Sequence, residues 1–472
     1  MAETKERCVL TLPLLTEPWQ EKILEKRFKI IEHLENSLIN TELKKLHTLE
    51  RTREYIDLSK QIQATEKENR KPLYKERQQM LQAAGFSEYA FKDAITPMQK
   101  HFVEHIGAQI AHKAASDVWR SFSMYLYGKG NAVHFKRRGS LNSVASQSAK
   151  SGMKYADNMF YWNGGQCENK ICLAIRVAYP SNDYEREMLT KEIKSYRVVR
   201  KWMKTRYKYY LQFMLVGSPV SKGRYKVSGR VGIKSGLTSI AVVSDKKAEK
   251  IELASKVQDN ANKIAMLQRK MDASRRATNP DNYDANGTIR RGRKTWTYSN
   301  HYKLYAGQVR ELQRKNADIR KYQHTCLANY ILSQGSDVYV NDTDYKFLQE
   351  RKKETEILPS GRIKIKKRYG KTLANRAPAM LMTILNTKLL GLGAEPLHKI
   401  TWKDYHAYEY DHTNNSCKQS KSKLPTRVLS NGDVVDRDLY AAFLIKCAAG
   451  SLNYPDKDMC AVDYDKFKKI SA

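Results

Sequence analysis

A glycine-rich turn between two predicted strands carries a lysine where metal-dependent nucleases commonly carry an aspartate. The stretch RYKVSGRVGIKSGLTSIAVVSD, residues 224–245, predicts a strand, a tight turn and a second strand, with Lys234 at the tip of the first strand. Nucleases of the ribonuclease-H type hold two metal ions about 3.5–4 Å apart, which clamp the attacking and leaving oxygens of a phosphodiester. Such cations need carboxylate oxygens, so Lys234 argues against this chemistry.

Cysteine usage gives little sign of a metal site. The seven cysteines are Cys8, Cys167, Cys172, Cys326, Cys417, Cys447 and Cys460. Cys167 and Cys172 lie close together, but no second pair accompanies them, and we expect no zinc there. The odd number and the irregular spacing favour a reducing cytosol.

Three basic stretches could contact a nucleic-acid backbone. ANGTIRRGRKTWTY (285–298) sets arginines beside aromatic residues, RKKETEILPSGRIKIKKRYGK (351–371) holds nine basic residues and two acidic ones, and 128–144 combines glycines with basic residues. The candidate contacts are Lys136, Arg137, Arg138, Arg290, Arg291, Arg293, Lys294, Trp296, Arg362, Lys364, Lys366, Lys367, Arg368 and Arg376. The alternative interpretation is an ordinary solvated surface.

The charge of the whole chain supports a polyanionic partner. Its 472 residues, enough for about three domains, contain 85 lysines and arginines against 50 acidic residues, a formal net charge of +35. That much self-repulsion favours a bound polyanion, although a basic surface of the ribosome-associated kind remains an alternative. The N-terminus has no apolar signal region, and no apolar run is long enough to span a membrane. We therefore expect a soluble intracellular protein with no membrane partner.

The first half predicts a helical region inserted into a β-rich module. A strand is expected at 8–15, and Thr16-Glu17-Pro18 predicts a helix start. Helical sequence continues to about residue 126, with divisions expected at Pro72 and Pro97. Further strands are expected at 159–164, 170–180 and 207–217, and the segment between the last two is left open as helix or loop.

The second half alternates between strand and helix patterns. Strands are expected at 225–233, 237–243, 249–254, 337–341 and 395–402, and helices at 256–277, 301–334, 371–391 and 436–449. Three strands joined by hairpins and followed by helix-linked strands predict a mixed α/β sheet of the ribonuclease-H-like kind.

Three motifs in this half resemble those of the TnpB proteins and type V CRISPR effectors. GIKSGLTSIAVVS (232–244) resembles the first RuvC motif, VYVNDTDYKFLQ (338–349) the second and VVDRDLYAAFLI (434–445) the third; YGKTLANRAPAMLMTIL (369–385) resembles a TnpB helix. Their order and spacing make the resemblance specific over residues 224–450.

The resemblance implies a bilobed domain plan. A wedge β-module would comprise 1–16 and 128–223, and a helical recognition lobe would occupy 17–127 as an insertion. A RuvC-like domain would comprise 224–402 and 436–472, interrupted at 403–435 by a degenerate zinc-ribbon region that binds nucleic acid.

The motifs depart from the family pattern at two of three catalytic positions. Lys234 stands where the first motif has Asp, and Asn341 stands where the second has Glu, so only Asp438 of the third motif remains. Asp342 neighbours Asn341, but adjacent strand residues point to opposite faces, and Asp436 is expected off the inner face of its helix. We expect Lys234 to pair with Asp438 in place of a metal, with the neutral Asn341 completing the site.

The zinc ribbon of the family is also incomplete. Only Cys417, with His406 and His412 nearby, remains of the two CxxC pairs expected there, so the region is predicted to be a metal-free nucleic-acid contact. Its basic residues are Lys418, Lys421, Lys423 and Arg427.

The resemblance then implies an RNA-guided DNA-binding protein that does not cut. Its partners would be a guide RNA, a target double-stranded DNA and a protein factor for transcription or transposition, without zinc or catalytic magnesium. It would repress transcription or recruit a partner at the nucleoid, in the cytoplasm of a prokaryote. Two alternatives stay open: a residual metal-dependent nuclease using Asp342, Asp438 and a further acidic residue, and a general RNA-binding protein without a guide.

Overall fold

The computed structural model forms two compact units, Met1–Val220 and Ser221–Ala472. It describes residues 7–150, 152–220, 227–349, 369–401, 409–417, 424–448 and 455–471. None of the helices in these ranges has the length and apolar character that crossing a bilayer requires.

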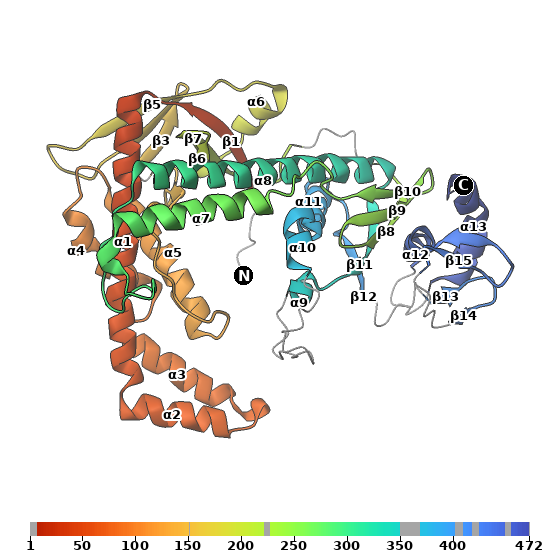
Figure 1. Ribbon diagram of the computed structural model, residues 1–472, viewed down its shortest axis with the longest axis horizontal. Coiled ribbons are helices and arrows are strands. Elements are labelled where there is room, and N and C mark those ends of the chain that lie inside the picture. Colours follow the sequence, from red (N-terminus) through yellow and green to blue (C-terminus); the bar gives the residue numbers. More distant parts are fainter. Residues whose placement is uncertain are drawn as a thin grey trace. The chain divides into compact units, whose positions relative to one another are not determined.

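The first unit is built on a seven-stranded sheet in the order β2-β6-β7-β1-β5-β4-β3 (Figure 1). The strands are β1 Arg7–Leu15, β2 Ser143–Ala145, β3 Met153–Ala156, β4 Met159–Asn163, β5 Cys172–Val177, β6 Ile193–Met203 and β7 Arg206–Val216. β1 lies antiparallel between β7 and β5, and its alternate residues from Cys8 to Leu14 are buried. The N-terminal strand therefore completes a sheet whose other strands follow more than 120 residues later.

Five helices lie between β1 and β2 in the chain. They are α1 Pro18–Glu50, α2 Arg53–Ala64, α3 Lys71–Ala83, α4 Glu88–Lys100 and α5 Ala108–Leu126, with a short 3-10 helix at Lys67–Asn69. The expected start of α1 is confirmed, because Glu17 and Gln20 form a capping box there. Pro72 lies in the first turn of α3, but Pro97 lies inside α4, so the expected division at Pro97 is wrong. The helix continues for only three residues beyond it, so the missing N–H disturbs its end alone.

The segment left open between helix and loop contains both a helix and a strand. α6 covers Asp183–Leu189 and β6 covers Ile193–Met203. β6 was not predicted because one of its inward positions is Arg200, whose burial hides the apolar alternation.

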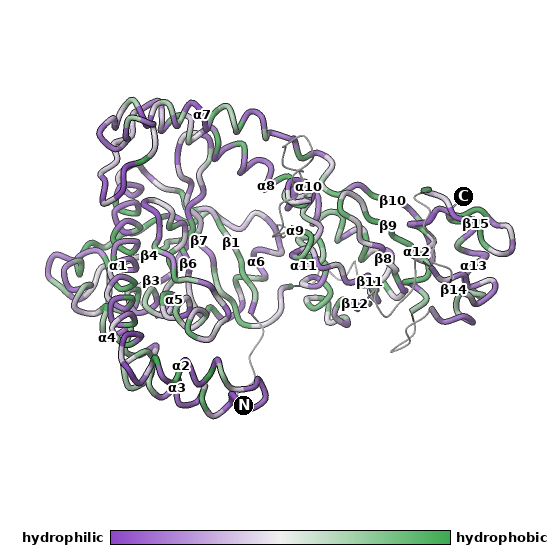
Figure 2. Tube along the Cα trace, turned by 60° about the horizontal axis from the view of Figure 1, so that its bottom comes forward, coloured by the Kyte–Doolittle hydropathy of each residue, from purple (hydrophilic) through white to green (hydrophobic). Residues whose placement is uncertain are grey.

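The second unit contains a five-stranded sheet in the order β10-β9-β8-β11-β12. The strands are β8 Arg230–Ser235, β9 Ser239–Val243, β10 Ala248–Glu252, β11 Asp337–Asp342 and β12 His398–Thr401. β8, β9 and β10 are antiparallel, whereas β11 is parallel to both β8 and β12. This is the mixed sheet that the sequence predicts, and Figure 2 shows hydrophobic residues in its strands β8 and β9.

Helices cover both faces of this sheet. Residues of α8 (Asn300–Gln334) and α11 (Pro378–Gly391) share one core with inward residues of β8, β9 and β11, and α12 (Arg437–Lys446) shares the other with Ala241 and Val243. α7 (Ala261–Thr278) lies along α8 (Figure 1). The remaining elements are the 3-10 helix Pro280–Asn282, α9 Tyr345–Gln349, α10 Gly370–Arg376, β13 Tyr410–Asp411, β14 Ser416–Cys417, β15 Thr426–Val428, β16 Val434–Asp436 and α13 Lys457–Ser471.

The helix expected at 371–391 is interrupted. Ala377 adopts φ 45°, a left-handed conformation, and separates α10 from α11. Pro378 disfavours a helical conformation at the residue before it, which explains the break.

Candidate functional site

Lys234 and Asn341, the first two motif positions, lie on the face of the sheet that α12 covers, and α12 carries the third, Asp438. Lys234 of β8 and Lys250 of β10 both pair in register with Ala241 of β9, so the three residues form one row across the sheet. Asn341 follows Val340, the partner of Ile233 on β8, and therefore lies beside Lys234 on the same face.

Gly232 lets α12 approach this face closely. A Cβ atom at residue 232 would lie 2.1 Å from the carbonyl oxygen of Ala442 and 2.5 Å from the backbone nitrogen of Lys446. Only glycine fits such an approach of two backbones. The glycine of the first motif thus determines how closely α12, the helix that carries Asp438, packs against the sheet.

Four charged side chains meet where β8, β10 and the start of α12 converge. Nζ of Lys234 lies 2.7 Å from Oδ1 of Asp438, so the predicted pairing is present. Nζ of Lys250 lies 2.6 Å from Oδ2 of Asp436 and 3.4 Å from Oδ2 of Asp438. Asp436 caps α12 by accepting hydrogen bonds from the backbone N–H groups of Asp438 and Leu439.

Lys250 was missed as a site residue by sequence reasoning. It lies on β10, a strand that the sequence predicts at 249–254, between the charged residues Glu249 and Glu252, and no motif marks it. Alternation along the strand places Lys250 on the opposite face from Glu249 and Ile251. Which face that is depends on the pairing of Lys250 with Ala241, and the sequence does not give this register.

The electrostatics of this cluster favour two ammonium groups over a metal ion. Desolvation acts to raise the pKa of Asp438, but the ammonium of Lys234 and then that of Lys250 hold it below its usual value. Desolvation likewise acts to lower the pKa of Lys250, and its contacts with Asp436 and Asp438 raise it. A single cation and a dication about 4 Å apart repel by about 8 kcal/mol at an effective dielectric constant of about 20. Two lysines and two aspartates balance without any added ion.

Asn341 links β11 to β8 through its amide. Its Oδ1 accepts a hydrogen bond of 2.6 Å from the backbone N–H of Ser235, and its Nδ2 donates to Oγ1 of Thr343 at 2.9 Å. The hydroxyl groups of Ser235 and Tyr345 also hydrogen-bond, and burial raises the pKa of Tyr345. A glutamate could not donate to Thr343, so asparagine suits this network.

Asp342 forms an ion pair on the face of the sheet opposite to Lys234 and Asn341. Its Oδ1 lies 3.7 Å from Nζ of Lys399 on β12, and the aspartate is exposed. Its position agrees with the expectation that Asp342 and Asn341 point to opposite faces.

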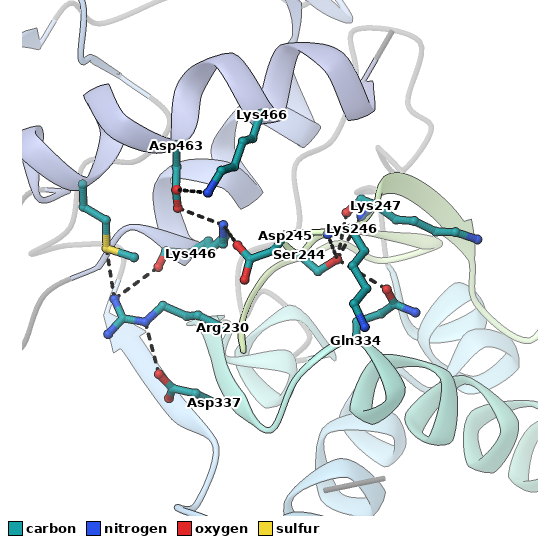
Figure 3. A network of polar contacts seen from close by, with 11 residues as sticks. Arg230, Ser244, Asp245, Lys246, Lys247, Gln334, Asp337, Lys446, Asp463 and Lys466 are labelled. Atoms are coloured by element: carbon teal, nitrogen blue, oxygen red, sulfur yellow. Dashed lines mark hydrogen bonds and ion pairs between the residues drawn. The ribbon is translucent and has the colours of Figure 1, made fainter. Parts of the chain in front are cut away.

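A buried lysine fixes the far end of α12. Lys446 is 3 % exposed, and its ammonium contacts Asp245 and, at 3.0 Å, Oδ2 of Asp463 (Figure 3). Burial acts against the charged form, but the two carboxylates outweigh it and raise the pKa of Lys446. Arg230 of β8 donates to the carbonyl oxygen of Ala448 at 2.9 Å. Both ends of α12 are therefore tied to the sheet by charged groups.

We expect a double-mutant cycle to measure the Lys234–Asp438 pair directly. Lys234→Ala should lower the free energy of unfolding by about 1–2 kcal/mol. The carboxylate of Asp438 is only 30 % exposed, and in this variant Lys250 is its one remaining cationic partner among the ion pairs described above. In the Asp438→Ala background the same change should cost clearly less. Urea denaturation of the four variants checks this, with the exposed Lys246→Ala as control. Equal costs in both backgrounds would show that the pair contributes nothing.

The loop that carries Lys136, Arg137 and Arg138 is held against α1. The carboxylate of Glu32 accepts hydrogen bonds from the backbone N–H groups of Gly139 (2.9 Å) and Leu141 (3.2 Å). Arg200 of β6 donates to the carbonyl oxygens of the same two residues. The arginines of the loop are exposed, so the predicted contacts are presented on a fixed backbone.

Glu35 of α1 is buried, and its Oε2 lies 3.9 Å from Nζ of Lys136 in this loop. Desolvation raises the pKa of Glu35 from 4.5 to about 7, against the opposing effect of Lys136. The folded chain therefore holds a proton that the unfolded chain loses, and stability should fall as pH rises from 4.5 to 7. The loss is complete above pH 7 and amounts to at most about 3 kcal/mol.

We expect Glu35→Gln to remove this loss. The variant should be more stable than the native chain at pH 8 and nearly equal to it at pH 5, as measured by chemical denaturation at both pH values. Glu54→Gln, at an exposed position of α2, is the matched control. Parallel pH profiles of Glu35→Gln and the native chain would contradict the prediction.

The loop 285–298 is partly engaged within its own unit. Nε of Arg290 donates to the carbonyl oxygen of Tyr283 at 2.8 Å, and Nζ of Lys294 donates to that of Gly292 at 3.0 Å. Trp296 is half-buried, with the guanidinium of Arg275 5.3 Å from its ring centroid. Arg291 and Arg293 are exposed, so these two are the loop residues best placed to contact a backbone.

Arg376, a predicted nucleic-acid contact, also has partners within its own unit. Its Nη1 donates to the carbonyl oxygens of Leu253 and Ala254, both at 3.0 Å, and its Nη2 lies 2.6 Å from Glu252. These contacts fasten α10 to the end of β10, and the assignment of Arg376 as a nucleic-acid contact stays a prediction. The predicted contacts Arg362, Lys364, Lys366, Lys367 and Arg368 lie outside the described residues.

Two of the three candidate zinc ligands have separate surroundings. His412 is buried and hydrogen-bonds through Nδ1 to the hydroxyl of Tyr440 at 2.7 Å, whereas Cys417 is exposed on β14. Desolvation lowers the pKa of His412. Arg427 donates to the carbonyl oxygens of Tyr410 and Glu409. His406, Lys418, Lys421 and Lys423 lie outside the described residues, and the described ones contain no group of three His, Cys, Asp or Glu side chains that could hold a metal.

The fold of this chain is similar to those of protein chains in two solved complexes. A Cas12f1–sgRNA–target DNA complex matches with a TM-score of 0.44 and 11 % identity over 94 % of this chain and 99 % of that one. A CRISPR–Cas12f ternary complex matches with a TM-score of 0.28 and 13 % identity over 92 % and 82 % of the two chains. No protein-family model and no curated protein matches. Because both TM-scores are below 0.5, the functional argument rests on the residues of this chain.

Proposed function

We propose that this chain is an RNA-guided DNA-binding protein that does not cut its target. Its partners would be a guide RNA, a target double-stranded DNA and a protein factor, and its effect would be to block transcription or to recruit that factor. The observation that carries the proposal is the contact of Lys234 with Asp438, 2.7 Å apart, at the position where the resembling family holds a metal-bound aspartate.

The remaining features fit this proposal. Lys250 and Asp436 complete a charge-balanced cluster, which supports a site that works without magnesium. The net charge of +35 and the exposed Arg137, Arg138, Arg291 and Arg293 supply attraction for a nucleic-acid backbone. The protein would act at the nucleoid of a prokaryotic cell, without zinc or magnesium as a cofactor.

Sequencing the RNA that co-purifies from the native host tests RNA guidance. We expect one dominant species with a constant scaffold and a short variable end, and that end would name the DNA target. A broad mixture of cellular RNA would overturn guidance and favour a general RNA-binding protein.

A cleavage assay with the guide and target so identified tests the absence of cutting. We expect intact DNA in the presence of either Mg²⁺ or Mn²⁺, two of the ions that can support metal-ion catalysis of this kind. Cutting that Asp438→Ala abolishes would instead establish a residual metal-dependent nuclease.

A further inference from the structure

A cavity of about 430 Å³ lies between α3 and the C-terminal end of α5 in the first unit. Its lining residues are Lys71, Tyr74, Lys75, Arg77, Gln78, Leu81, Tyr127 and Gly128. Those from α3 follow helical spacing and so share one face of that helix. The volume is within the usual range of small-ligand sites, about 300–1,000 Å³.

The lining combines positive charge with exposed aromatic rings. Tyr74 is 47 % exposed and Tyr127 is 46 % exposed. Three cations line the cavity and no acidic residue does. The first turn of α3 also carries no acidic side chain, so the positive end of its helix dipole adds to this potential.

Arg77 holds the cavity in shape. Its Nη2 donates to the backbone carbonyl oxygen of Leu126 at the end of α5, and its guanidinium lies 5.9 Å from the ring centroid of Tyr74. Leu81, which is 2 % exposed, belongs to the hydrophobic core beneath. The cavity therefore has an apolar base, a fixed arginine and an exposed cationic rim.

A second cavity of the same volume provides a contrast. It also adjoins α5 and is lined by Glu88, Lys113, Ser116, Trp119, Arg120, Ser123 and Gln147. Lys113 is paired with Asp117 at 2.6 Å, and Glu88 adds a negative charge. The charge of that cavity is compensated, so of the two the α3 cavity has the chemistry for a phosphate.

We infer that the α3 cavity binds one nucleotide of a single-stranded nucleic acid. The base packs against the rings of Tyr74 and Tyr127, Gln78 hydrogen-bonds its edge, and the phosphate contacts Lys71 and Lys75. Every base offers a π-face to an aromatic ring, and lysines neutralise the backbone. The inference rests on the proposed function, because it takes the ligand to be a strand that the protein binds.

Photochemical cross-linking to the full-length chain locates the nucleotide. The probes are one RNA and one DNA 12-mer that each carry a single 5-iodouracil, and mass spectrometry identifies the modified residues. We expect adducts on Tyr74 or Tyr127, and the arm with the higher yield identifies the strand. Adducts found only on other residues would overturn the inference.

Affinities of the same oligonucleotides separate stacking from general charge attraction. Tyr74→Ala and Tyr127→Ala should each weaken binding about tenfold while leaving the salt dependence unchanged, and Tyr74→Phe should bind like the native chain. Lys75→Gln should reduce the slope of log K against log salt by about one.

The matched control is Tyr89→Ala on α4, a 79 % exposed tyrosine beside Lys92 and outside the cavity, which should change nothing. Unchanged affinity in both tyrosine-to-alanine variants would overturn the inference. That failure differs from failure of the proposed function, which a heterogeneous co-purifying RNA would show even when Tyr74 or Tyr127 is cross-linked.

Discussion

Gly232→Ala should destabilise the second unit by about 3 kcal/mol, because the added methyl group has no space. Its Cβ would lie 2.1 Å from the carbonyl oxygen of Ala442 and 2.8 Å from Cα of Lys446, and both atoms belong to the backbone of α12. A flexible side chain could move aside, but a helix held at both ends by ion pairs cannot do so without breaking them.

Native-state hydrogen exchange measures this effect where it arises. We expect faster exchange of the α12 amides in Gly232→Ala, together with loss of the Lys234–Asp438 contact. Gly370→Ala is the control, since among the described residues nothing lies within 4 Å of the Cβ position there. If the α12 amides kept their native protection in Gly232→Ala, the close seating of this helix would be refuted.

Arg27→Met should cost the first unit about 3–5 kcal/mol, because it removes a fully buried cation from its partners. Nη1 and Nη2 of Arg27 donate to the carbonyl oxygens of Trp162 (2.5 Å) and Ile171 (2.6 Å), and the guanidinium lies 5.0 Å from the ring centroid of Trp162. Burial lowers the pKa of Arg27 to about 10, so the side chain remains charged at neutral pH. Its loss removes one donor from each of the two carbonyl groups and weakens the attachment of α1 to β4.

Two further variants separate charge from geometry. Arg27→Lys keeps the charge but cannot reach both carbonyl groups as a planar fork, so we expect an intermediate loss of about 1–2 kcal/mol. Lys26→Met changes the exposed neighbouring residue and should leave stability nearly unchanged. Chemical denaturation of the three variants provides the test. A native-like Arg27→Met would show that Arg27 does not bind α1 to the sheet.

Most elements of the fold were predictable because their patterns are local. The expected strands at 8–15, 159–164, 207–217 and 337–341 correspond to β1, β4, β7 and β11 within one or two residues. Alternation of buried and exposed residues fixed them, as in β1. β6 was not predicted because the buried Arg200 interrupts its alternation of apolar and polar residues. α13 was not predicted either, because no motif marks it.

The candidate site was predictable only in part. The motifs singled out Lys234, Asn341 and Asp438, and the ion pair between the first and last is present. Arg376 is predicted to contact nucleic acid because it is basic, and the structure adds that its guanidinium contacts Glu252 and two backbone carbonyl groups. Residue type shows that a side chain is able to contact nucleic acid. Only the neighbouring groups in the folded chain show which contacts that side chain already makes.

The sequence by itself determined that two of the three motif carboxylates are absent, because residue identity at a motif position needs no coordinates. It also determined the excess of positive charge and the alternation that forms the strands. Only the tertiary structure decided that Lys250 joins Lys234 at Asp438. Residues far apart along the chain meet through strand register and the depth of a packed helix, and both depend on long-range contacts that no local pattern records.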